Sequence, residues 1–158
     1  MLAILLAAGV IMAKVDPITN FEDIGVAHKV LAVTLFRELQ SPDFRRDHRL
    51  MLAVIANRAA KSGQSMAWEC LKKWQFSYWN RFWDGTVLTL TMSKLDSEYK
   101  KVPITFIESL IEERKAKAIA DMHINHFYCP TAMNPKFSVP GWARGKEPVY
   151  VTKKFRYY

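Results

Sequence analysis

The chain has 158 residues and a mass of 18.3 kDa, which fits a single domain of about 100–200 residues. Half of the residues are hydrophobic and 13% are aromatic, a composition that excludes a wholly disordered chain. Lys and Arg number 23 against 15 Asp and Glu, so the formal charge is +8. This charge favours an anionic partner: nucleic acid, an anionic membrane or a cell-envelope polymer.

Residues 1–20 form a segment of their own, in which Met1–Ala13 is apolar throughout. The run is shorter than the about 20 residues of a membrane-spanning helix, and no basic residues precede it as in a secretory signal. We expect a core helix here, with a weak export or anchor segment and a tail of a longer precursor as alternatives. Membrane contact is expected only if this segment acts as an anchor, and residues 21–158 are expected to form the functional domain.

Helical patterns dominate the first half of the chain. Apolar residues recur at helical spacing in Val26–Gln40, and Ser41-Pro42 then predicts the start of a second helix over about Phe44–Lys61. The inner face of this second helix carries Leu50, Ala53, Val54 and Asn57. A short third helix is expected at Met66–Trp74, and the aromatic stretch Gln75–Asp84 is expected to be a loop with local turns.

Strand patterns appear only in the second half. Thr86–Met92 alternates and is rich in β-branched residues, which predicts a strand, and Ile104–Met122 predicts another helix. Prolines make the chain irregular from His123 onward, until Pro148–Tyr158 predicts a terminal strand. The fold class is therefore α+β, predominantly α, with a small β element and long loops.

Glu38 is the most informative candidate for chemistry, because it continues the apolar face set by Leu31 and Leu35. A carboxyl group at the edge of an apolar face loses hydration in its charged form, which raises its pKa. A raised pKa is what a general acid needs near neutral pH. The alternative is an exposed glutamate at a helix end that pairs with Arg37 or Arg45.

Two further features suit sugar binding. Asn57 is an amide on an apolar helix face, where it either braces a neighbouring segment or orients a substrate. Gln75–Asn80 mixes aromatic rings with hydrogen-bonding side chains, which fits a glycan groove, stacked nucleobases or ordinary core.

The polar cluster after the helix predicted at Ile104–Met122 contains His123, His126, Tyr128 and Cys129. Its H-x2-H-x2-C spacing is not one of the common zinc spacings, so no metal is expected even with Cys70 added. Cys129 stands directly before Pro130, where no helix N-terminus activates its thiol as a nucleophile. Clustered glycines for phosphate binding are absent from the sequence, so we expect no cofactor. The two cysteines could form one bridge, which the sequence leaves open.

Several segments together resemble the SleB-type cell wall hydrolases, which include spore-cortex-lytic enzymes and many phage lysins. They are LAVTLFREL (Leu31–Leu39), LMLAVIANRAAKSG (Leu50–Gly63) and QFSYWN (Gln75–Asn80). INHFYCPTAMNPKF and PGWARG are similar to the family's His-Tyr-Asn-Pro segment and the Trp-bearing loop after it. The chain departs from the family at Leu39–Pro42, where small residues are usual, and at Phe155, where the family has a histidine.

The resemblance implies a lysozyme-like domain that cleaves the glycan strand of peptidoglycan between N-acetylmuramic acid and N-acetylglucosamine. It places the catalytic acid on Glu38, with a lytic transglycosylase-like route through this single glutamate or a muramidase-like route as alternatives. Together with the residue patterns, it points to these substrate-binding residues: Asn57, Gln75, Phe76, Ser77, Tyr78, His126, Tyr128 and Trp142.

The expected partner is thus the glycan strand, and the expected state is a monomer that acts at the bacterial cell wall, in the periplasm or spore cortex. Presence in a host cytoplasm before release, or in a virion, is also compatible with a lysin. One alternative is a basic nucleic-acid-binding module, but the basic residues are spread along the chain, so we expect no nucleic-acid partner. The other alternative is an inactive structural protein of a virion or envelope.

Overall fold

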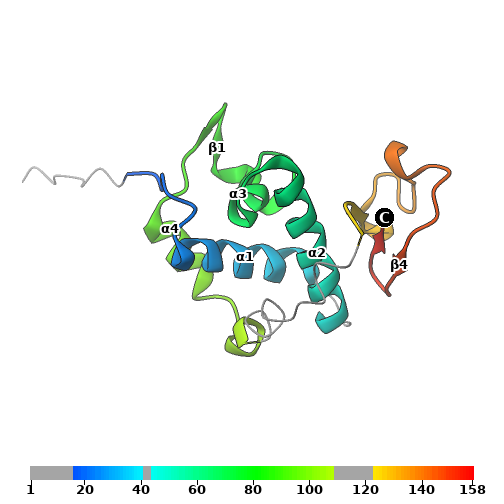
Figure 1. The fold of residues 1–158 in the computed structure, drawn as a ribbon, viewed down its shortest axis with the longest axis horizontal. Helices are drawn as coiled ribbons and strands as arrows, with labels where there is room; N and C mark the ends of the chain where they lie inside the picture. Colours follow the sequence, from blue (N-terminus) through cyan, green and yellow to red (C-terminus); the bar gives the residue numbers. More distant parts are fainter. Residues whose placement is uncertain (1–15, 41–43, 109–122) are drawn as a thin grey trace, which may run out of the picture.

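The computed structural model describes residues 16–40, 44–108 and 123–158, which form a mixed α+β protein dominated by helices (Figure 1). The α-helices are α1 (Ile24–Leu39), α2 (Phe44–Ser62), α3 (Met66–Leu71) and α4 (Met92–Tyr99), and residues 104–108 are also helical. The short 3-10 helices are η1 (Ser77–Phe82), η3 (Pro130–Ala132) and η4 (Gly141–Ala143).

Helix α1 is the central element of the core. Its N-terminus is capped by Asp23, whose carboxylate accepts a hydrogen bond from the Val26 N–H at 3.0 Å. Leu31 and Leu35 are buried, and α1 packs against α2, α3, α4 and η1. Figure 1 shows α1 running through the middle of the molecule, with α3 above it and α4 and α2 towards its two ends. The periodicity therefore predicted α1 correctly, and the apolar residues predicted for the inner face of α2 are likewise buried.

The aromatic stretch after α3 contributes to the same core. The segment predicted as a loop folds into η1, and Trp79 is fully buried against α1. The Trp79 indole N–H donates to the Thr34 hydroxyl at 2.8 Å, and this hydroxyl donates to the Val30 carbonyl at 2.7 Å. The buried polar atoms of the indole and the hydroxyl are thus paired.

The strands form small antiparallel sheets within the described ranges. β1 (Trp83–Asp84) pairs with β2 (Val87–Leu88), with Trp83 opposite Leu88. A second sheet has the order β3-β5-β4, built from Phe127–Tyr128, Arg156–Tyr157 and Tyr150–Val151.

Two strand predictions differ from the structure. Of the predicted strand Thr86–Met92, only Val87–Leu88 lies in a sheet, while Thr91 bridges Pro17 and caps α4 through its hydroxyl, 3.3 Å from the Lys94 N–H. The cap starts a helix that buries Leu95, which the alternating pattern concealed. The predicted terminal strand over Pro148–Tyr158 is a hairpin of β4 and β5, because the chain reverses between them.

Other predictions lie partly outside the described residues. The helix predicted at Ile104–Met122 is helical over residues 104–108, and its remainder falls outside them. The predictions for residues 1–13 and for the N-cap at Ser41 also fall outside them.

Candidate active site

A cavity of about 790 Å³ opens where the end of α1 meets α2, α3, η1 and the segment around His126. Its wall carries two carboxylates, Glu38 and Glu69, and three basic side chains, those of Arg58, Lys61 and Lys72. Amide, hydroxyl and aromatic groups complete the lining: Trp74, Gln75, Ser77, Asn80, Asn125, His126 and Trp142 are among them. A cavity of this size and polarity is large enough for a small ligand or part of a polymer.

Glu38 lies one residue before the end of α1 and is half-buried in the cavity wall. The Ser77 hydroxyl donates to its Oε1 at 3.4 Å, and the backbone N–H groups of Ser77 and Tyr78 also point at the carboxylate. Burial raises the pKa of Glu38 above its usual value, although these donors and the charge of Lys154 offset part of the rise. The carboxyl group is therefore placed in a cavity with a pKa shifted towards neutrality.

Glu69 is a second carboxylate of the cavity, and sequence reasoning missed it. Glu69 is only 2% exposed, and its carboxylate accepts hydrogen bonds from Lys72 Nζ at 3.2 Å and from the Ser62 hydroxyl at 3.3 Å. The only signal in the sequence was an acid within the otherwise mostly apolar helix α3, between Ala67 and Cys70. An acid that is this buried needs partners, and here it has them.

Arg58 connects the cavity wall to the C-terminal segment. Its Nε donates to the Asn125 carbonyl at 2.6 Å, and its Nη1 donates to the Gln75 side-chain oxygen at 2.8 Å. Burial lowers the pKa of Arg58, and the nearby Glu69 charge offsets part of this change. This arginine thus fixes two residues of the cavity wall while remaining a lining residue itself.

The structure brings several predicted site residues together around Glu38. Gln75, Ser77, His126 and Trp142 all line the same cavity. The His126 ring lies 4.9 Å from the Trp142 ring, and its pKa is lowered by desolvation and then by the charges of Arg58, Lys146 and Lys61. All four residues are distant from Glu38 along the chain, so only folding unites them with it.

Other predicted site residues are not part of the cavity wall, and their side chains make other contacts. Phe76 is 1% exposed and stacks on Phe127 within the core. Asn57 braces the C-terminal segment, since its Nδ2 donates to the Ile124 carbonyl at 2.8 Å. Tyr128 packs behind Trp142 and stacks on Tyr158, so it supports the wall rather than lining it.

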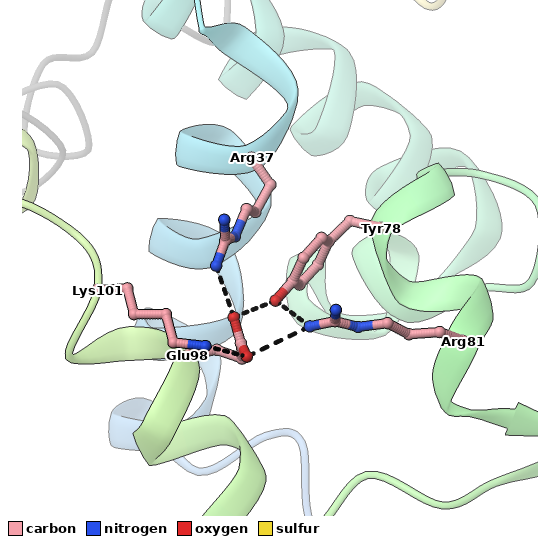
Figure 2. Close-up of polar contacts among 5 residues, drawn as sticks. All are labelled: Arg37, Tyr78, Arg81, Glu98 and Lys101. Atoms are coloured by element: carbon pink, nitrogen blue, oxygen red, sulfur yellow. Dashed lines mark hydrogen bonds and ion pairs between the residues drawn. The ribbon is translucent and has the colours of Figure 1, made fainter.

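Tyr78 is the fourth of these residues, and its side chain joins a charged cluster centred on Glu98 (Figure 2). We name the set Arg37, Tyr78, Arg81, Glu98 and Lys101 the Glu98 cluster. Glu98 accepts from Arg37 Nη2 at 2.8 Å, from Lys101 Nζ at 2.7 Å and from the Tyr78 hydroxyl, and Arg81 lies at 3.3 Å. Arg37 therefore pairs with Glu98, and not with Glu38 as the alternative interpretation of the sequence proposed.

Titration in the Glu98 cluster follows from these contacts. Burial by itself raises the pKa of Glu98, but hydrogen bonds from Lys101, Tyr78 and Arg37 outweigh it and lower the pKa to about 2. Burial and the neighbouring Glu98 carboxylate raise the pKa of Tyr78 to about 12. Glu98 thus stays ionised over the whole physiological range.

No family model, curated protein or solved structure matches this chain. The resemblance to the SleB-type hydrolases consequently rests on the quoted segments alone.

Residues 16–40, 44–108 and 123–158 contain no group of three or more His, Cys, Asp or Glu side chains that could hold a metal ion. Cys70 and Cys129 are free thiols, and burial raises the pKa of Cys70 to about 12. The same described ranges contain no helix with the length and apolar character needed to cross a membrane.

Proposed function

We propose that this protein cleaves the glycan strand of peptidoglycan between N-acetylmuramic acid and N-acetylglucosamine, with Glu38 as the general acid. The observation that carries the proposal is the half-buried carboxyl group of Glu38, with its raised pKa, on the wall of a cavity rich in hydrogen-bonding groups. A protonated carboxyl in such a site can donate to a glycosidic oxygen near neutral pH. In this proposal the helical core is a lysozyme-like domain.

The first chemical step uses the proton on Glu38. This proton moves to the glycosidic oxygen as the bond to the anomeric carbon breaks, and positive charge develops on the sugar ring. In the second step the carboxylate accepts the proton of the muramyl 6-hydroxyl, whose oxygen bonds to the anomeric carbon and closes a 1,6-anhydro ring. Glu38 is regenerated in its protonated form, so a single carboxylate serves both steps.

Binding and orientation fall to the remaining residues of the cavity. Ser77 lies beside Glu38 and Gln75 lines the same cavity, where both can bond acetamido and hydroxyl groups, while His126 and Trp142 supply an aromatic wall. The basic residues Arg58, Lys61 and Lys72 favour an anionic polymer. The proposed place of action is the bacterial cell wall, for a phage or bacterial lysin that works as a monomer without a cofactor.

The decisive experiment is Glu38→Gln, assayed as the loss of turbidity of purified peptidoglycan. We expect the rate to fall by about 10²–10⁴-fold, because the amide cannot donate the proton. Glu22→Gln, which changes an exposed glutamate outside this cavity, is the matched control and should keep the native rate. A native rate in the Glu38 variant would remove the proposed acid.

Mass spectrometry of the released fragments distinguishes the two routes. Anhydro ends are expected from the single-glutamate route. Reducing ends would instead indicate hydrolysis, for which a second carboxylate is the usual requirement, and Glu69 is the acid that shares the cavity with Glu38.

A further inference from the structure

Trp74 is a large apolar side chain that the fold leaves in solvent at the edge of the Glu38 cavity. It lines the cavity, yet 76% of the residue is exposed. It stands in the turn between α3 and η1, next to Gln75. Burial in the core therefore does not explain a tryptophan at this position.

The backbone of Trp74 is also strained. Its φ is +71°, in the left-handed region that glycine occupies readily and that a bulky side chain rarely adopts. Such conformations persist where surrounding contacts enforce them, and they concentrate at functional sites. Both the left-handed backbone and the exposure of the indole are thus unfavourable for the stability of the fold.

Contacts with Asn80 and Gly85 hold the turn in this conformation. The Trp74 N–H donates to the Asn80 side-chain oxygen at 2.8 Å, and Asn80 itself lines the cavity. Lys73 Nζ lies 5.4 Å from the centre of the indole and donates to the Gly85 carbonyl at 2.6 Å. The backbone of the turn is consequently fixed, and it presents the indole at the cavity edge before any ligand binds.

We propose that Trp74 is a sugar-stacking residue that forms a glycan subsite at the edge of the Glu38 cavity. The inference rests on the proposed function and adds a contact outside the bond-breaking centre. An indole face is apolar and electron-rich, and so it stacks on the C–H face of a pyranose ring. The amide side chains of Gln75 and Asn80 line the same cavity, where they can hydrogen-bond polar substituents of a bound sugar. Stacked nucleobases are the competing ligand, because an indole binds their faces as well.

The test compares Trp74→Gly with Phe137→Gly, with Glu38→Gln present in both so that bound sugar is not turned over. Phe137 is a matched control, since it is 68% exposed, has a φ of +64° and lies outside the cavity wall. Binding of oligomers of β-1,4-linked N-acetylglucosamine is measured by calorimetry on the full chain, and the melting temperature is measured in parallel.

We expect Trp74→Gly to weaken sugar binding by roughly tenfold, as for the loss of one aromatic contact. Its melting temperature should stay level or rise by up to about 4 °C, because glycine relieves the left-handed backbone. Phe137→Gly should show the same thermal behaviour with native sugar binding. Only a binding role separates the two variants in this way.

Three results would overturn the inference. They are native sugar binding in Trp74→Gly, a lower melting temperature for Trp74→Gly alone, and an oligothymidylate that binds through Trp74 in place of the sugar. Failure of the proposed function is a different result. Cell wall cleavage that survives Glu38→Gln would contradict the role of Glu38 as the acid but not the Trp74 subsite. Unchanged sugar affinity in Trp74→Gly would contradict the subsite alone.

Discussion

Glu38 links stability to acidity at the level of one residue. Its carboxyl group is half-buried, so the ionised form is disfavoured in the folded chain, while the unfolded chain hydrates it freely. The backbone N–H groups of Ser77 and Tyr78 recover part of this loss. A site that keeps an acid ready to donate therefore costs folding free energy at neutral pH.

The sign of this cost can be measured with Glu38→Gln. Because the folded pKa lies above the unfolded one, the folded chain binds more protons between the two values, and the free energy of unfolding falls as pH rises through them. The glutamine of the variant does not ionise, so its free energy of unfolding does not fall in this way. The variant should therefore be more stable than the native chain at neutral pH. The difference should vanish in acid, below the usual glutamate pKa.

Urea unfolding at a series of pH values checks this expectation. Glu22→Gln, at an exposed position, should stay within about 0.5 kcal/mol of the native chain at every pH. A Glu38 variant that is less stable than the native chain at neutral pH would show that the donors around the carboxylate outweigh its desolvation, and that the folded pKa lies below the unfolded one.

At the scale of elements, the Glu98 cluster joins α4 to α1 and η1 (Figure 2). Arg37 belongs to α1 and directly precedes Glu38, while Tyr78 belongs to η1 and follows Ser77. Contacts of Glu98 with Arg37 and Tyr78 thus hold together the two elements that supply the acid and its N–H donors. The residues of the cluster do not line the cavity, but they connect the elements that do.

Glu98→Gln is expected to lower the free energy of unfolding by about 1–3 kcal/mol, because hydrogen bonds to a charged and mostly buried group are lost. The stabilisation by native Glu98 is full above the unfolded glutamate pKa and is lost as pH falls from there towards about 2. Urea unfolding of native and variant chains should therefore converge in acid.

Asp96→Asn on the same helix is the control for this experiment. Asp96 pairs with Lys29 at 2.6 Å, but its side chain is 43% exposed, and an exposed ion pair contributes less than about 1 kcal/mol. Equal losses from the two variants would contradict the central role of Glu98.

At the scale of the whole molecule, the C-terminal segment docks onto the helical core and completes one wall of the cavity. Figure 1 shows this segment at one end of the molecule, beside α2. Besides the contacts from Asn57 and Arg58, the Tyr157 hydroxyl donates to Asp47 at 3.0 Å, with both residues fully buried. Lys154 Nζ donates to the Leu39 carbonyl at 2.7 Å, at the end of α1.

Tyr157→Phe should lower the free energy of unfolding by about 1–3 kcal/mol, since buried Asp47 loses a donor while the aromatic ring remains. Denaturant titration measures the change. Tyr150→Phe, at a half-buried position on the neighbouring strand β4, should cost less. A larger cost at Tyr150 would mean that the docking of this segment does not depend on the Asp47 contact.

The spacing of apolar residues was sufficient to predict the helices with long apolar faces. It also indicated one candidate site residue, Glu38, on such a face. Leu31, Leu35 and Glu38 repeat at helical spacing, and the structure places them in the core and at its edge as expected. The pattern failed for α4, because Thr91 ends an alternating run and caps a helix at the same time. It failed again in η1, where one turn directs Phe76 into the core and the Tyr78 side chain towards Glu98.

The sequence by itself determined a helical chain with an acid at the edge of its apolar core, because helix periodicity depends on neighbours three and four residues apart. Only the tertiary structure decided which groups share the cavity with that acid. Glu69 and Trp74, which the sequence did not single out, reach it because α3 packs against α1. His126, which the resemblance had suggested, reaches it through contacts between distant segments, such as the bond from Asn57 to Ile124, 67 residues away. Such contacts depend on how whole elements pack, and no local pattern encodes them.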